Sequence, residues 1–227
     1  NWSDDAFGLA SSNISDGSRL APATATADFN SQYTLIRAAN NILEKGPKTG
    51  IVAATLDRYL AEARFFRAWG YFNLLQRYGS VPLVTKTLTD DSPELTAGSA
   101  TRDEILTLIM ADLDFAGAKL PTPTALGTTD YGRIANTAAL AFKARVALFE
   151  GTRAKFHNYG DSKKYLTMAV AASKAVMDSK QHDLYAGPYF NIFQYEGEGR
   201  ANKENVMVKQ YGVSLTDRVT SHTYCRG

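Results

Sequence analysis

Residues 61–85 read AEARFFRAWGYFNLLQRYGSVPLVT, a stretch that predicts one long helix ending at Gly79. Its aromatic residues are Phe65, Phe66, Trp69, Tyr71, Phe72 and Tyr78. With about 3.6 residues per turn, these side chains fall on almost every side of the helix. A helix that is apolar all round is a buried one, so the stretch indicates core packing. Arg64 and Arg67 would then need carbonyl or carboxylate partners on neighbouring helices.

The composition is that of an ordinary globular protein. The chain has 227 residues, of which 44% are hydrophobic and 21% are charged, and it can bury a full core. A net charge of +2 gives no support for a nucleic-acid surface. The single cysteine, Cys225, excludes an internal disulfide and a thiolate metal cluster. No segment approaches the roughly 18 apolar residues of a membrane span.

Apolar spacings of three and four residues predict further helices around this one. The five predicted helices cover residues 29–46, about 51–78, the stretch after Thr101, residues 135–151 and about 162–179. Together they should cover about half of the chain. We expect the core to include Ala63, Phe66, Phe72, Leu108 and Ala144.

Several helix ends can be assigned from local residues. Thr101 and Glu104 match a capping box, in which each side chain bonds the other residue's backbone N–H. Asn136 is expected to cap the fourth predicted helix, and Gly151 to end it. The stretch NVMVKQY, residues 205–211, is the one predicted strand.

The fourth and fifth predicted helices resemble a tetratricopeptide pair: an Ala-rich helix, a glycine turn, and a helix with aromatic and then small residues at spacing four. The fold is therefore predicted to be mainly α, with tetratricopeptide-like helix pairs. We expect a single region over residues 1–227, with a helical core at about 30–180 and irregular structure at 181–227.

The residues give little support for catalysis or metal binding. His157, His182 and His222 lie far apart without ligand spacing, so no metal site is expected. There is no nucleophile elbow and no glycine-rich phosphate loop. The adjacent carboxylates Asp4–Asp5 and Asp90–Asp91 are interpreted as solvated loop residues, whereas a glycosidase would need two carboxylates facing each other across a sugar.

The long helix and the VPLVT that follows it resemble the signature segment of the SusD/RagB family of surface glycan-binding lipoproteins. Further segments resemble the family in the same order, from about Trp2 to Tyr211. They are SDDAFG, YTLIRAANNILE, TRDEILTLIMADLDFAGAKLP, GRIANTAALAFKARVALFEG and NKENVMVKQY.

The resemblance implies a right-handed superhelix of tetratricopeptide-like helix pairs with long irregular loops. It implies a protein without catalytic activity or cofactor that binds an oligosaccharide or polysaccharide at the outer membrane. The implied partner is a SusC-like TonB-dependent transporter, and the implied anchor is a lipid outside this chain. Because family members are more than twice as long, we expect the chain to be an N-terminal fragment.

The resemblance also implies where ligand contacts lie. The loop leading into the first helix holds Arg19, Phe29 and Asn30, with Trp2 as another early aromatic residue. The later candidates are Tyr211, Arg218, His222 and Tyr224. Phe29 stands where relatives often carry a tryptophan, so its face for stacking is smaller. The alternative is that Phe29 is a hydrophobic staple for the first helix and that Trp2 packs in the core.

Two other functions remain open. A tetratricopeptide-like superhelix could bind a protein or peptide in its concave groove. A glycoside hydrolase is the third interpretation and rests only on the paired carboxylates.

Overall fold

The computed structural model describes residues 17–18, 20, 26–193, 197 and 199–208. Its α-helices are α1 (Ala27–Lys45), α2 (Ala53–Tyr78), α3 (Arg102–Lys119), α4 (Asn136–Phe156) and α5 (Ser162–Asp178). Three short 3₁₀ helices are η1 (Gly46–Lys48), η2 (Pro93–Thr96) and η3 (Tyr189–Phe193). The α-helices contain 19, 26, 18, 21 and 17 residues, close to the predicted half of the chain.

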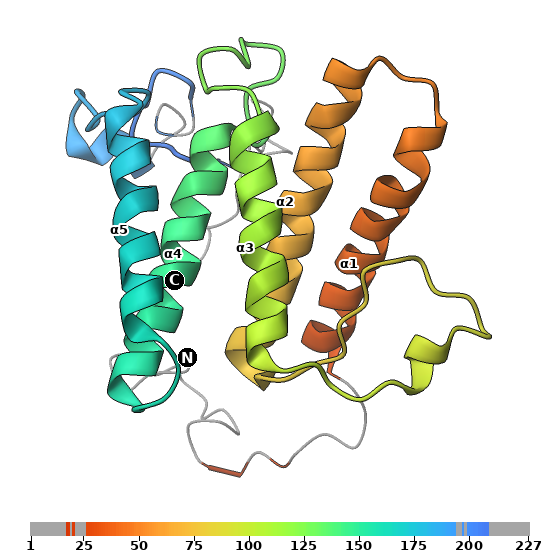
Figure 1. The fold of residues 1–227 in the computed structure, drawn as a ribbon. Coiled ribbons are helices and arrows are strands. Elements are labelled where there is room, and N and C mark those ends of the chain that lie inside the picture. The colour runs from red at the N-terminus through yellow and green to blue at the C-terminus, as the bar shows by residue number, and fades with distance from the viewer. Residues whose placement is uncertain (1–16, 19, 21–25, 194–196, 198, 209–227) are drawn as a thin grey trace.

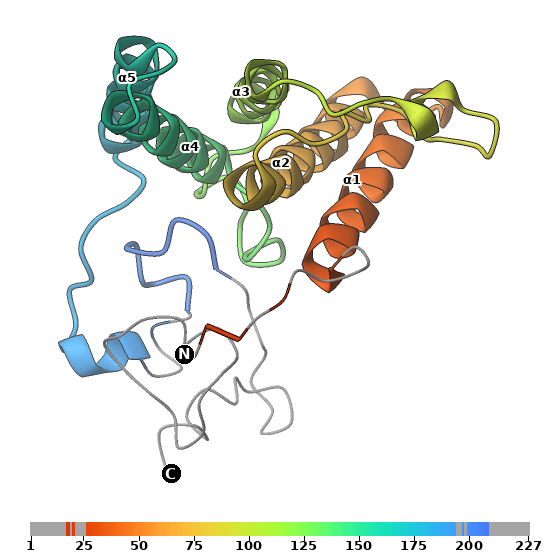
Figure 2. The same cartoon turned by 90° about the horizontal axis from the view of Figure 1, so that it is seen from below.

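The α-helices stand side by side, and each packs on the next one along the chain (Figure 1). Seen from below, they form a staggered row from α5 through α4, α3 and α2 to α1 (Figure 2). The pairs α1–α2 and α4–α5 are antiparallel hairpins, as tetratricopeptide-like packing requires. The predicted fold class is therefore confirmed.

This arrangement gathers separate parts of the sequence at the two ends of the row. The lower end in Figure 1 carries the start of α1, the end of α2, the start of α3 and the turn between α4 and α5. The upper end carries the α1–α2 connection and the loop between α3 and α4. No helix within the described residues is long and apolar enough to cross a membrane.

The core forms along the shared faces of α2, α3 and α4. Ala63, Phe72 and Ala144 are buried as predicted, whereas Leu108 is only partly buried. The prediction for Phe66 is wrong, because its side chain is 39% exposed. Successive helical residues point about 100° apart, and it is the neighbouring Phe65, 1% exposed, that faces the core.

The structure confirms one of the predicted helix caps and contradicts another. The capping box of Thr101 and Glu104 is confirmed, with the Glu104 N–H donating to Thr101 Oγ1 over 3.3 Å. Asn136 is not a cap: it is the first residue of α4, and the N-cap is Ala135.

Gly151 does not end α4, which continues to Phe156. A Cβ atom at Gly151 would lie 2.8 Å from the Leu166 side chain, so the glycine permits the close approach of α4 and α5. The chain turns instead at Asn158 and Gly160, which have φ angles of 62° and 81°.

The predicted strand at residues 205–211 is not found where it can be checked. Residues 205–208 form bends and irregular chain, and no strand occurs within the described ranges. Residues 209–211 lie outside them.

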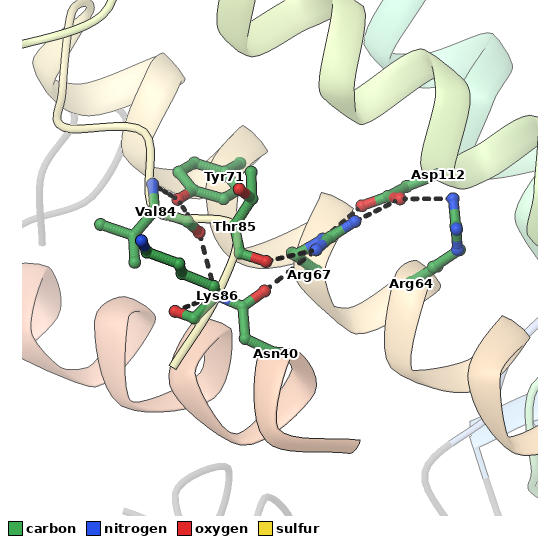
Figure 3. Close-up of polar contacts among 8 residues, drawn as sticks. All are labelled: Asn40, Arg64, Arg67, Tyr71, Val84, Thr85, Lys86 and Asp112. Atoms are coloured by element: carbon green, nitrogen blue, oxygen red, sulfur yellow. Dashed lines mark hydrogen bonds and ion pairs between the residues drawn. The ribbon is translucent and has the colours of Figure 1, made fainter. Parts of the chain in front are cut away.

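A buried ion pair at the middle of α2 joins three helices (Figure 3). The fully buried carboxylate of Asp112 on α3 accepts hydrogen bonds from Arg67 Nε at 2.7 Å and Nη2 at 2.8 Å. Arg67 Nη1 donates to Asn40 Oδ1 on α1 over 3.0 Å. Arg64 also contacts Asp112, at 3.4 Å. Both arginines thus have the partners that the sequence analysis required.

The same network fixes the extended segment that follows α2. Asn40 Nδ2 donates to the carbonyl oxygens of Val84 at 2.9 Å and Lys86 at 3.3 Å (Figure 3). The Tyr71 hydroxyl donates to Val84 O and accepts from Val84 N–H, at 2.8 and 2.7 Å. Burial raises the pKa of Tyr71 to about 12, so the hydroxyl remains a donor at neutral pH.

The two adjacent phenylalanines give a paired test of the core. Phe65→Ala should lower the free energy of unfolding by about 3–5 kcal/mol, as expected for a large buried aromatic residue. Phe66→Ala should cost clearly less, because its ring is already partly in water. Urea unfolding of both variants measures the difference. Equal losses would contradict the assignment of Phe65 to the core.

Removing the charge of Asp112 tests the buried network. Asp112→Asn leaves the Arg67 guanidinium buried without its counter-ion, and breaking such a pair costs about 3–5 kcal/mol. The matched control is Asp114→Asn on the same helix. Asp114 is 60% exposed and pairs with Lys143, so its loss should cost at most about 1 kcal/mol. Urea unfolding of both variants should show this contrast, and similar losses would refute it.

Candidate ligand-binding surface

The candidate surface lies at the lower end of the row, where α1 begins beside the end of α2. Thr26 caps α1 by accepting the Phe29 N–H at 3.3 Å. The same hydroxyl lies 2.7 Å from the Tyr78 hydroxyl, on the last residue of α2. A single side chain thus begins one helix and joins it to the end of the other.

Phe29 forms the aromatic centre of this surface. Its ring centroid lies 4.9 Å from that of Tyr33 and 5.2 Å, edge-on, from that of Tyr78. A hydrophobic staple uses the residue before the N-cap, but Phe29 is the third residue after the Thr26 cap. It is therefore not the staple; it packs the ends of α1 and α2 together while remaining half-buried.

Planar polar side chains surround these rings. Asn30 is exposed, and Asp28 pairs with Arg77 at 2.5 Å, each of the pair being more than half exposed. One turn further along α1, Gln32 Oε1 accepts from Asn73 Nδ2 at 3.3 Å. Amides, a carboxylate and a guanidinium supply both donors and acceptors in fixed planes.

Aromatic rings beside polar groups of this kind offer the contacts that a sugar needs. Tyr78 is 41% exposed, so part of an aromatic ring is open to the C–H face of a pyranose. Asn30 on α1 and Arg77 next to Tyr78 on α2 supply hydrogen-bonding groups for its hydroxyl groups.

The structure brings together only part of the predicted site. Phe29 and Asn30 are adjacent on α1, and both lie on this surface. The other predicted ligand residues lie outside the described residues; they are Trp2, Arg19, Tyr211, Arg218, His222 and Tyr224. Their roles stay predictions.

Asp28, Arg77 and Tyr78 were not among the predicted site residues, although they belong to the candidate surface. Tyr78 was assigned only to core packing. The predicted helical hairpin could have indicated Tyr78. In an antiparallel pair, the last residues of the second helix lie beside the first residues of the first helix.

Among the residues that the structure describes, the candidates for catalysis and metal binding form no cluster; Asp4, Asp5 and His222 lie outside those residues. Asp90 and Asp91 are both exposed in the loop before η2. His182 contacts Thr137 Oγ1 at 2.8 Å and Lys203 O at 3.1 Å, so it joins α4 to the segment after α5. In the part of the chain that the structure describes, no three His, Cys, Asp or Glu residues are placed to hold a metal ion.

Comparison with known proteins identifies relatives of this fold. A sequence model of the SusD-like family described as "Starch-binding associating with outer membrane" matches residues 6–148. The chain is 28% identical over 182 residues to SusD-like protein P38 of Formosa agariphila, which covers 79% of this chain and 33% of that protein.

Solved structures show the same similarity in three dimensions. A SusD-like protein from Bacteroides fragilis matches 84% of this chain and 34% of its own, with a TM-score of 0.68 at 24% identity. A laminarin-binding SusD-like protein matches 82% of this chain and 39% of its own, with a TM-score of 0.64 at 23% identity. The chain thus spans about a third of the length of these relatives. Because the family's sequence model matches more than half of it, the chain belongs to the SusD-like family.

Proposed function

We propose that the protein binds an oligosaccharide or polysaccharide at the cell surface, without catalysis, and delivers it to a TonB-dependent outer-membrane transporter. The observation that carries this proposal is the family match over residues 6–148, since that family is described as starch-binding and associated with the outer membrane. Attachment to the outer membrane through a lipid anchor is part of the same proposal.

The surface around Phe29 supports the binding step. Half-buried Phe29 and exposed Tyr78 present aromatic carbon, and Asn30 and the Asp28–Arg77 pair present hydrogen-bonding groups beside it. These groups sit on helix ends that a hydrogen bond joins directly, so little conformational entropy is lost when a ligand is bound.

Delivery to a transporter requires no chemical step on the ligand. The proposed ligand surface lies where α1 begins and α2 ends, at the lower end of the helical row (Figure 1). We expect the full-length protein to co-purify with a large β-barrel transporter from gently solubilised membranes, with or without sugar. A partner-free monomer from such membranes would count against the delivery step.

Binding itself is tested with the full-length protein and a panel of polysaccharides that includes starch and laminarin. Retardation in polysaccharide-containing native gels, followed by calorimetry, should identify at least one ligand. The same ligand, incubated with the purified protein, should release no reducing sugar. Release that disappears on mutation of one carboxylate would instead favour a glycoside hydrolase.

Variants of the lower-end surface test the site. Tyr78→Ala, Phe29→Ala and Asn30→Ala should each weaken binding, by about fivefold where a stacked aromatic ring is lost. Phe66→Ala is the matched control, because Phe66 is an aromatic residue of the same helix with similar exposure, 39% against 41% for Tyr78. Calorimetry with the identified ligand measures the affinities. Unchanged affinity in all three variants, with folding intact, would place the ligand elsewhere.

One observation favours the alternative of a protein- or peptide-binding scaffold. A groove between α1 and α2 is lined mainly by apolar side chains, and four of them, Ile42, Ile51, Tyr59 and Phe66, are exposed by 46%, 44%, 42% and 39%. Apolar anchors in a groove are typical of helix-binding surfaces. If this were the main function, Phe66→Ala would abolish partner binding and the polysaccharide panel would show no ligand.

A further inference from the structure

The turn between α4 and α5 exposes an unusual amount of aromatic surface. Residues 155–161 read KFHNYGD, and we call them the aromatic turn. Phe156 is 77% exposed, Tyr159 is 53% exposed, and His157 between them is also exposed. Isolated exposed apolar residues are common, but rings gathered within four residues indicate a surface that meets something other than water.

The backbone of the aromatic turn is held by hydrogen bonds. The His157 N–H donates to Arg153 O at 3.0 Å, and the Tyr159 N–H donates to Ala154 O at 3.2 Å. On the other side, the Asp161 carboxylate caps α5 by accepting the Lys164 N–H at 2.9 Å. The rings are therefore presented by two helix ends that are pinned to each other where Gly151 meets Leu166.

A cation also packs against the ring of Tyr159. The Arg153 guanidinium lies 4.1 Å from the centroid of its ring and is itself bonded to Glu150, which is 2% exposed. Glu150 also accepts from Arg102 Nε at 2.9 Å, at the start of α3. Burial alone would raise the pKa of Glu150, but the bonds from Arg153 and Arg102 lower it, so the carboxylate stays ionised at neutral pH.

One face of the Tyr159 ring thus rests on a cation, and its exposed part faces solvent. The ring centroids of His157 and Tyr159 are 6.3 Å apart, and exposed Asn158 lies between them in sequence. Imidazole and amide groups both donate and accept hydrogen bonds. Flat apolar rings interleaved with such groups match the alternating C–H faces and hydroxyl groups of a pyranose.

We propose that Phe156, His157 and Tyr159 form a second carbohydrate-contacting surface that binds a pyranose unit of the same polysaccharide. This inference rests on the proposed function. The aromatic turn and the surface around Phe29 both lie at the lower end of the helical row (Figure 1). A polymer of repeating units can touch both, and a second contact on one chain strengthens binding through a raised effective concentration.

Lipid headgroups are the competing ligand, because Lys155, Lys163 and Lys164 are also exposed near the turn. Two of these cations lie against rings: Lys155 is 5.9 Å from the Phe156 ring centroid and Lys164 is 5.2 Å from that of Tyr165. The residues between the two exposed rings in sequence are a histidine and an asparagine, which both donate and accept hydrogen bonds, as sugar hydroxyl groups require. These residue types, together with the family match, favour a sugar.

The test uses the full-length protein with Phe156→Ala, Phe156→Leu and Tyr159→Ala. Wild type is first assayed in native gels that contain starch or laminarin and then by calorimetry with each polymer that it binds. Each alanine variant should bind the polymer about threefold to tenfold more weakly. Phe156→Leu keeps apolar volume but loses the flat ring, so it should be nearly as weak as Phe156→Ala. Thermal midpoints should match wild type, because Phe156 is largely exposed.

A short oligosaccharide of the same sugar separates the two surfaces. It cannot span both, so its affinity for the Phe29 surface should be unchanged in the Phe156 variants, while affinity for the polymer falls. Polymer binding equal to wild type in both alanine variants would overturn this inference and leave the proposed function standing. A wild type that binds no polysaccharide would overturn the proposed function and this inference with it.

Sedimentation with vesicles of phosphatidylethanolamine and phosphatidylglycerol tests whether the aromatic turn binds lipid headgroups instead. The inference predicts that the Phe156 and Tyr159 variants sediment as wild type does. If they lost vesicle binding while keeping full polymer affinity, the aromatic turn would be a membrane contact and not a sugar contact.

Discussion

The buried charge of Asp112 is the constraint on which the arrangement of the first three helices depends. A carboxylate without solvent access is strongly destabilising unless a cation and further hydrogen bonds satisfy it. Arg67 meets this need with two parallel bonds, and its Nη1 donates to Asn40 Oδ1 and, over 3.5 Å, to the carbonyl oxygen of Thr85. Because Asn40 in turn holds the carbonyl oxygens of Val84 and Lys86, one ion pair sets the relative positions of α1, α2, α3 and the segment that leaves α2.

A rigid helix pair explains why a ligand surface can be built from helix ends. Once α1 and α2 are fixed at their middle by Arg67, their lower ends meet in a defined register, and Thr26, Phe29 and Tyr78 come into contact. Glu150 has the corresponding role on the other side of the row, where it joins the start of α3 to the last turns of α4. Buried ionic groups thus orient two surfaces that are themselves largely exposed.

The sequence predicts those features that depend on near neighbours. The capping box of Thr101 and Glu104 needs only residues three apart, and apolar spacing gives the approximate positions of the five α-helices. Phe65 and Phe66 are the same residue type, so only the packing of the other helices on α2 decides which one faces the core: the ring of Phe65 lies 5.6 Å from that of Phe142 on α4. Gly151 looks like a helix terminator until Leu166 is placed beside it. Tyr78 and Arg77 become part of the proposed ligand surface only through contacts with residues about fifty positions earlier.

The extended segment after α2 has a further consequence for how the protein behaves among its neighbours. Exposed extended backbone is a template onto which another chain can add a strand. Here side chains have taken the places of a strand partner: the Tyr33 hydroxyl binds Pro82 O, and Tyr71 binds both polar groups of Val84. The Ala100 N–H binds Val81 O. With the carbonyl groups of Val81, Pro82 and Val84 already occupied, this piece of chain is a poorer template for intermolecular β-pairing.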